Sequence, residues 1–281
     1  MNVLQIFLLA VVQGFAELLP VSSSAHVIVA ERLMGLDPTA PEMTLLLVML
    51  HTGTMLAVIL YFWRRWRKTY LRSEGAFRSN AKLLIVATVA TGVTGVALLQ
   101  AIKYGVMRAN PAFEIEDLFG NSILMATALA AAGVLIIVSS RIKENPLGEI
   151  SVTKAVWIGA VQGLCLPFRG FSRSGATIST GMLLGAARHR CEEFSFALAV
   201  LLTPPVVAKE AYRFYKAQSG LGLEYKTSLL HLLGPSLLGM GLSFVAGLVA
   251  LRWLSGWLDH GRWHFFGLYC LVAAVVVLVI R

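Results

Sequence analysis

Apolar residues run along this chain in long blocks. Six blocks approach the ~20 residues that a helix needs to cross the hydrocarbon core of a bilayer, at residues 43–63, 83–101, 120–140, 192–209, 228–251 and 263–280. Such blocks are typical of membrane-spanning helices. The pattern therefore predicts an all-α polytopic membrane protein with about six transmembrane helices.

Composition agrees with this prediction and excludes other classes. Hydrophobic residues make up 57% of the 281 residues and charged residues 14%, which is more apolar surface than a soluble domain of this length buries. The net charge of +9 does not indicate nucleic-acid binding, because the basic residues are scattered through short loops and no soluble face is left for a duplex. Cys165, Cys191 and Cys270 are widely spaced, so they predict neither a disulfide framework nor a metal cluster.

Basic residues predict the orientation of the chain in the membrane. The segment 64–82 contains seven of them, Arg64, Arg65, Arg67, Lys68, Arg72, Arg78 and Lys82. The positive-inside rule places this segment in the cytoplasm. Residues 141–154 and 252–262 then lie inside, whereas residues 103–118, residues 212–226 and both termini lie outside.

Two segments, residues 1–35 and 151–187, carry a helical apolar pattern that is interrupted near its middle. The first interruption is Leu19-Pro-Val-Ser-Ser-Ser24, where proline ends one helix and serine caps the next. The second is Pro167-Phe-Arg-Gly-Phe-Ser-Arg-Ser-Gly175. Each half is too short to span a bilayer alone, so each segment predicts a re-entrant helical hairpin.

The two hairpins align without gaps. Val12-Gln13-Gly14 matches Val161-Gln162-Gly163, and the same offset sets residues 20–26 against residues 169–175. This echo predicts a duplicated unit, and the orientation above makes the two copies an inverted repeat.

The repeats predicted within the single membrane domain 1–281 cover about residues 1–140 and 151–281. Non-helical backbone within a membrane is tolerated only where protein or a water-filled cavity satisfies it. The two interruptions are therefore expected to meet near the middle of the membrane and to line a cavity.

Ionisable side chains inside these apolar hairpins are the candidate functional residues. Glu17, His26 and Arg173 are costly to bury, and such residues are usually functional, although an internal structural ion pair is the alternative. Gln13 and Glu17 are four residues apart and share a helix face, as do Ser23 and His26, three apart. The interruptions are thus expected to present an acid, an imidazole and hydroxyls together.

Serines at the two interruptions predict an anion site. They are Ser22, Ser23, Ser24, Ser172 and Ser174. Hydroxyls and free backbone N–H groups at a helix start bind anions. Arg173 adds a planar donor fork that suits phosphate oxygens. A phosphorylated ligand fits this pattern best.

The segment from Gln13 to His26 resembles the glutamate-rich motif and Pro-Val-Ser-Ser segment of the undecaprenyl-diphosphate phosphatases associated with bacitracin resistance. Gly170-Phe-Ser-Arg-Ser-Gly-Ala-Thr-Ile-Ser179 resembles their second motif. The resemblance extends from about residue 4 to the end, including His51-Thr-Gly-Thr-Met-Leu-Ala-Val58 and Glu193-Phe-Ser-Phe-Ala-Leu-Ala199.

The resemblance implies removal of one phosphate from undecaprenyl diphosphate, which recycles the lipid carrier for cell-wall synthesis. It implies a site in the bacterial cytoplasmic (inner) membrane, open to the extracytoplasmic side. Glu17 matches an essential acid, Ser23 a proposed nucleophile, His26 a proposed base or alternative nucleophile, and Arg173 the diphosphate-binding arginine. The family uses Mg²⁺ or Ca²⁺, for which the Glu17 carboxylate is a suitable hard ligand.

Four positions depart from the family pattern. Gln13 stands where glutamate is common, so it is expected to orient a ligand rather than bind the metal. Arg169 replaces a proline, which adds a cation near the phosphate or alters the turn. Leu47 replaces an acidic residue, and Ala25 a common glycine.

Two further alternatives stay open. Inverted repeats with broken helices are also typical of transporters, so a lipid-phosphate transporter or flippase is the second functional hypothesis. Gly234, Gly239 and Gly241 could permit close helix contact in a homodimer, or equally serve packing within one chain.

Overall fold

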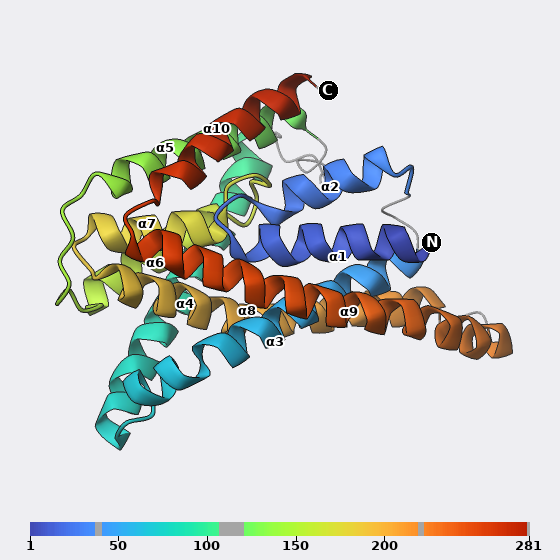
Figure 1. The fold of residues 1–281 in the computed structure, drawn as a ribbon, viewed down its shortest axis with the longest axis horizontal. Coiled ribbons are helices and arrows are strands. Elements are labelled where there is room, and N and C mark those ends of the chain that lie inside the picture. The colour runs from blue at the N-terminus through green and yellow to red at the C-terminus, as the bar shows by residue number, and fades with distance from the viewer. Residues whose placement is uncertain (37–40, 107–120, 219–221, 280–281) are drawn as a thin grey trace. The chain divides into compact units, whose positions relative to one another are not determined.

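The computed structural model describes residues 1–36, 41–106, 121–218 and 222–279, and every regular element in them is a helix. The helices are α1 (Val3–Leu18), α2 (Ser23–Leu33), α3 (Pro41–Thr69), α4 (Glu74–Ala101), α5 (Ser122–Ser140), α6 (Val152–Leu164), α7 (Arg173–Leu183), α8 (Arg188–Gln218), α9 (Gly222–Asp259) and α10 (His264–Val279). A π-helical turn, Ile102–Val106, extends α4. The all-α prediction is confirmed (Figure 1).

Five helices are long and apolar enough to cross a membrane. They contain the segments Met43–Thr69, Glu74–Gly105, Ser122–Ser140, Arg188–Lys209 and Leu233–Asp259. These segments confirm five of the six predicted blocks and a multi-pass membrane protein. The sixth block forms α10, which has 16 residues and is shorter than the other five.

The helices divide into two compact units. Unit 1 comprises residues 1–18, 23–63 and 199–253. Unit 2 comprises residues 19–22, 64–198 and 254–281. The first interruption, residues 19–22, therefore belongs to unit 2 although the helices on either side of it belong to unit 1.

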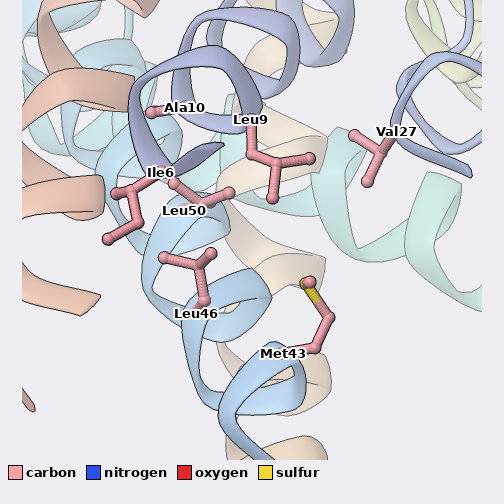
Figure 2. Packing of buried hydrophobic residues seen from close by; sticks show 7 residues of the cluster. All are labelled: Ile6, Leu9, Ala10, Val27, Met43, Leu46 and Leu50. Carbon is pink, nitrogen blue, oxygen red and sulfur yellow. The ribbon is translucent and has the colours of Figure 1, made fainter. Parts of the chain in front are cut away.

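The core of unit 1 forms where α1 and α2 pack on α3. Figure 1 shows α1 and α2 side by side in opposite directions, and they are in contact. The apolar side chains that meet in this core are Ile6, Leu9, Ala10, Val27, Met43, Leu46 and Leu50 (Figure 2). Ser243 of α9 donates a hydrogen bond to the carbonyl oxygen of Leu50 over 3.0 Å, which joins α9 to α3.

One glycine of the proposed homodimer contact packs inside unit 1. A Cβ added at Gly239 would lie 2.7 Å from Leu46 Cδ1 and 3.1 Å from Leu50 Cδ2. Gly234 and Gly241 are exposed, with no heavy atom of the described residues within 4 Å of an added Cβ. Gly239 therefore serves internal packing, and a homodimer through the other two stays a prediction.

Unit 2 is organised around a buried tryptophan at the start of α10. The indole nitrogen of Trp263 donates to the hydroxyl oxygens of Ser139 in α5 and Ser179 in α7, each over 3.1 Å. Ser139 in turn donates to Ser179 over 2.9 Å. These bonds tie three helices together in an interior where an unpaired indole N–H would be costly.

Charged residues at the start of α8 are buried but paired. Glu192 accepts a hydrogen bond from Arg65 over 3.0 Å and another from the hydroxyl of Ser255. Glu193 accepts a bond from Arg190 over 3.1 Å. Because a buried charge is tolerated when it is paired and hydrogen-bonded, these contacts explain how α8 buries two carboxylates near its start.

Close contact between α5 and α10 depends on two facing glycines. A Cβ added at Gly267 would lie 2.7 Å from the Gly133 carbonyl oxygen, and one added at Gly133 would lie 2.8 Å from the Gly267 carbonyl oxygen. The two backbones thus approach each other where neither residue has a side chain, as is common between membrane helices.

We predict that Gly267→Ala lowers the free energy of unfolding by about 1–3 kcal/mol, because the added methyl group overpacks this contact. The control is Gly256→Ala in α9, where no described atom lies within 4 Å of the added Cβ. This control should be neutral or stabilising, by up to about 1 kcal/mol. Thermal unfolding in detergent measures both, and equal midpoints would contradict the close contact.

Candidate active site

The first interruption is a short turn between α1 and α2. Pro20 cannot continue α1, which ends at Leu18, and α2 begins at Ser23. Ser22, immediately before α2, has a φ of 69°, in the left-handed region that side-chain-bearing residues rarely adopt. It is also buried, with 8% of its surface exposed. Strained backbone of this kind often marks functional sites.

Glu17 is the centre of the polar group in unit 1. Its Oε2 atom accepts a hydrogen bond from the Ser23 hydroxyl over 2.7 Å and one from the Gln13 side-chain amide over 3.4 Å. Gln13 is buried, whereas 17% of the Glu17 side chain is exposed. The spacing of four residues on α1 places Gln13 and Glu17 on one face, as predicted from the sequence.

A histidine on α3 joins this group. His51 Nε2 lies 3.8 Å from Glu17 Oε2, and His51 Nδ1 lies 2.8 Å from the carbonyl oxygen of Leu47. Because a carbonyl only accepts, Nδ1 carries the proton of that bond and Nε2 faces the carboxylate. His51 is not among the site residues predicted from the sequence, although a histidine within an apolar span is itself a signal of function.

The other predicted residues of the first hairpin lie at the start of α2. Ser24 is the second residue of α2 and His26 the fourth, and both are partly buried. His26 follows Ser23 by three residues, so the two share a helix face. The imidazole thus belongs to the same end of α2 as the hydroxyl that Glu17 binds.

The second interruption leads from α6 into α7. Ser172 is the N-cap of α7, and its hydroxyl accepts a hydrogen bond from the Gly175 backbone N–H over 3.3 Å. Arg173 is the first residue of α7 and is partly buried, as is Arg169 within the interruption. Ser172 and Ser174 are buried.

The two interruptions meet within unit 2. Ser174 donates a hydrogen bond to the Leu19 carbonyl oxygen over 3.4 Å. A Cβ added at Gly175 would lie 3.2 Å from Pro20 Cβ, so only a residue without a side chain fits there comfortably. Cys270 of α10 donates to the Pro20 carbonyl oxygen over 3.2 Å. The contact agrees with the prediction that the two interruptions lie together.

A threonine that the sequence analysis did not select holds the first turn of α7. Thr177 Oγ1 lies 2.6 Å from Ser195 Oγ on α8 and donates to the Arg173 carbonyl oxygen over 2.9 Å. Both Thr177 and Ser195 are fully buried. Only the packing of α7 on α8 shows this pair, since the two residues are 18 positions apart in the chain.

Binding of a divalent cation near Glu17 depends on the donor atoms of the side chains around it. Among the described residues, no group of three or more His, Cys, Asp or Glu side chains is arranged to hold a metal ion. Glu17 nevertheless supplies a carboxylate, with the hydroxyl oxygen of Ser23 as a hard neutral donor 2.7 Å away. Mg²⁺ is commonly held by one or two carboxylates together with substrate phosphates. The donor set therefore fits an ion shared with a phosphorylated ligand.

Comparison with known proteins gives full-length matches. A family model described as "Bacitracin resistance protein BacA" matches residues 6–276. "Undecaprenyl-diphosphatase 2" of Acinetobacter baylyi is 58% identical over 280 residues, covering 100% of this chain and 98% of the relative. "Undecaprenyl-diphosphatase" of Thermus thermophilus is 34% identical over 274 residues, covering 96% and 94%. That of Desulfitobacterium hafniense is 29% identical over 288 residues, covering 99% and 95%.

The conformation of Ser22 generates a prediction about stability. In the left-handed region a side chain costs about 1–2 kcal/mol, so Ser22→Gly should be more stable than Ser22→Ala by about that amount. At Ser24, inside α2, the order should reverse, because alanine favours a helix over glycine by about 1 kcal/mol. Thermal unfolding of the four variants tests this, and alanine being the more stable residue at both positions would disprove the turn geometry.

Proposed function

This chain belongs to the bacitracin resistance protein BacA family, and from that membership we propose that it hydrolyses undecaprenyl diphosphate to undecaprenyl phosphate and inorganic phosphate. The relatives named above are undecaprenyl-diphosphatases. The reaction would recycle the lipid carrier for cell-wall synthesis in the bacterial cytoplasmic membrane. The observation that carries the proposal is the 2.7 Å hydrogen bond from the Ser23 hydroxyl to the Glu17 carboxylate.

This bond is the arrangement that an activated nucleophile needs. A general base must lie within about 2.6–3.2 Å of the heavy atom whose proton it removes. Ser23 Oγ attacks the terminal phosphorus and gives its proton to Glu17. The bond from that phosphorus to the bridging oxygen breaks, and undecaprenyl phosphate leaves. Water then hydrolyses the phosphoserine and releases inorganic phosphate.

His26 has two roles open to it. In the serine mechanism it is the second group that carries a proton, one helical turn after Ser23. In the alternative mechanism its imidazole attacks phosphorus directly. The hydrogen bond between Ser23 and Glu17 favours the serine mechanism, because it already directs the hydroxyl proton toward a base.

Arg173 and the start of α7 are proposed to bind the diphosphate. The hydroxyl of Ser174 donates to the Leu19 carbonyl oxygen, whereas that of Ser172 accepts from the Gly175 N–H and keeps its own proton to donate. The guanidinium of Arg173, the Ser172 hydroxyl and the backbone N–H groups at the helix start are therefore the proposed donors to phosphate oxygens. Arg169 adds a second cation to the same interruption.

A divalent cation, Mg²⁺ or Ca²⁺, is proposed to bind Glu17 together with diphosphate oxygens. When bound, it supplies positive charge that offsets the negative charge developing around phosphorus. His51 would act as a positioning residue, because its imidazole ring lies beside the Glu17 carboxylate, with Nε2 3.8 Å from Oε2.

We also propose that the two interrupted segments are re-entrant hairpins of an inverted repeat, with the site open to the extracytoplasmic side. Both segments are helix, interruption and helix, since α1 and α2 are in contact and so are α6 and α7. Gln13 and Gln162 occupy matching positions and are both buried. The contact between the interruptions supports the same arrangement.

We predict that Ser23→Ala and Glu17→Gln each lower phosphate release from undecaprenyl diphosphate by about 10²–10⁴-fold, because they remove the nucleophile or its base. Detergent-purified protein, with and without added Mg²⁺ or Ca²⁺, provides the assay. Ser140→Ala in α5 is the control, because among the described residues its hydroxyl bonds only the backbone carbonyl oxygen of Ile137. A fully active Ser23→Ala variant would disprove the serine mechanism.

Two further readouts separate the alternatives in the same assay. Trapping the phosphoenzyme and mapping it to Ser23 or His26 identifies the nucleophile. His51→Ala should lower kcat by about tenfold with little change in KM, because it disturbs the base rather than substrate binding. No phosphate release from folded wild-type protein would favour the transporter hypothesis.

The proposed orientation predicts which residues can be labelled from outside. In a variant without Cys165, Cys191 and Cys270, a membrane-impermeant maleimide should label Asn2→Cys in intact cells. It should label Leu147→Cys, at a site that is 90% exposed, only after permeabilisation. Labelling in the opposite order would reverse the orientation.

A further inference from the structure

Four basic side chains of unit 2 form a concave surface at the end of α3 and in the turn that follows it. Arg64, Arg67, Lys68 and Arg72 line a recess of about 670 Å³. The first three lie in the last turns of α3, and Arg72 lies in the turn before α4. A recess of this volume falls within the range of small-ligand sites, which is roughly 300–1,000 Å³. We call it the basic recess.

The charge of the basic recess is not neutralised within the described part of the chain. All four side chains are exposed, and none forms an ion pair with a described carboxylate. Their neighbours differ, because Arg65 pairs with Glu192 over 3.0 Å and Arg78 pairs with Glu74 over 2.6 Å. The recess therefore combines the geometry of a binding site with positive charge available to an anion.

The chain places the basic recess at a membrane surface. It lies at the end of one candidate membrane span, Met43–Thr69, and in the turn before the next, Glu74–Gly105. Exposed apolar side chains flank it in sequence: Trp63 is 49% exposed, Leu71 51% and Phe77 52%. Aromatic residues beside cations are typical of the level where lipid headgroups meet the hydrocarbon core. A ligand there would need an anionic head and an apolar body.

We propose that the basic recess binds the headgroup of an anionic phospholipid. Arginine forks match phosphate oxygens, and basic pockets between transmembrane helices bind anionic lipid headgroups. The positive-inside rule assigns this segment to the cytoplasm, where the anionic leaflet attracts such residues. The observation that carries the proposal is that four cations, none of which pairs with a described carboxylate, converge in one concavity. A high count of positive charges would not by itself produce such a recess. The proposal does not depend on the proposed phosphatase activity.

The experiment compares lipid binding of purified full-length variants by native mass spectrometry and by titration with fluorescent lipids. Wild-type protein should bind phosphatidylglycerol on the order of tenfold or more tightly than phosphatidylcholine. The quadruple variant R64Q/R67Q/K68Q/R72Q should lose this preference. The matched control R78Q/K82Q/R141Q/K143Q removes four exposed cations outside the recess and should keep it.

A conservative variant and a competition experiment test whether the recess itself recognises the lipid headgroup. The variant R64K/R67K/R72K keeps the charge and should keep most of the preference, which separates loss of binding from loss of folding. Equal loss in the recess and control variants would show attraction to net charge and overturn the proposal. Inorganic phosphate should not displace the lipid at millimolar concentration; a recess that binds phosphate as tightly as lipid would equally overturn it.

Discussion

Backbone N–H and C=O groups that lie outside the helices of an apolar chain need hydrogen-bond partners within the protein. The rest of this structure depends on how the two interruptions satisfy this requirement. The carbonyl oxygens of Leu19 and Pro20 accept hydrogen bonds from Ser174 and Cys270, and Ser172 satisfies the N–H of Gly175. Each interruption thus lies against groups that complete its hydrogen bonding. Without these contacts a lipid environment would favour continuous helices, and neither a serine turn nor an arginine at a helix start could be held in place.

The carboxylates inside this protein have two kinds of hydrogen-bond partners. Glu192 and Glu193 are paired with Arg65 and Arg190, which is the arrangement of a structural ion pair. Glu17 instead accepts bonds from a hydroxyl and an amide, with an imidazole 3.8 Å away, and it remains partly exposed. A carboxylate that accepts a proton-bearing hydroxyl is suited to chemistry rather than to stability. The hydrogen bond from the Ser23 hydroxyl therefore favours the catalytic interpretation of Glu17.

Much of the architecture could be predicted because it depends on local signals. Block length predicts the spanning helices, and proline followed by serine predicts the first interruption between α1 and α2. The shared face of Gln13 and Glu17 follows from their spacing of four on one helix. The last apolar block, residues 263–280, also predicted a spanning helix, but it forms α10, which has 16 residues and is shorter than the five candidate spans.

Other features depend on which helices pack together, and no local pattern contains that information. Residue His51 lies on a different helix from Glu17, and the bond between Thr177 and Ser195 joins α7 to α8. Packing also placed Gly239 against Leu46 and joined the hydroxyl of Ser174 to the Leu19 carbonyl oxygen. Residue order and spacing are enough to specify helices, their interruptions and the family motifs, because these follow from nearest neighbours. The partner of each polar side chain was decided only in three dimensions, since hydrogen bonds act over a few ångströms between residues that are far apart in the chain.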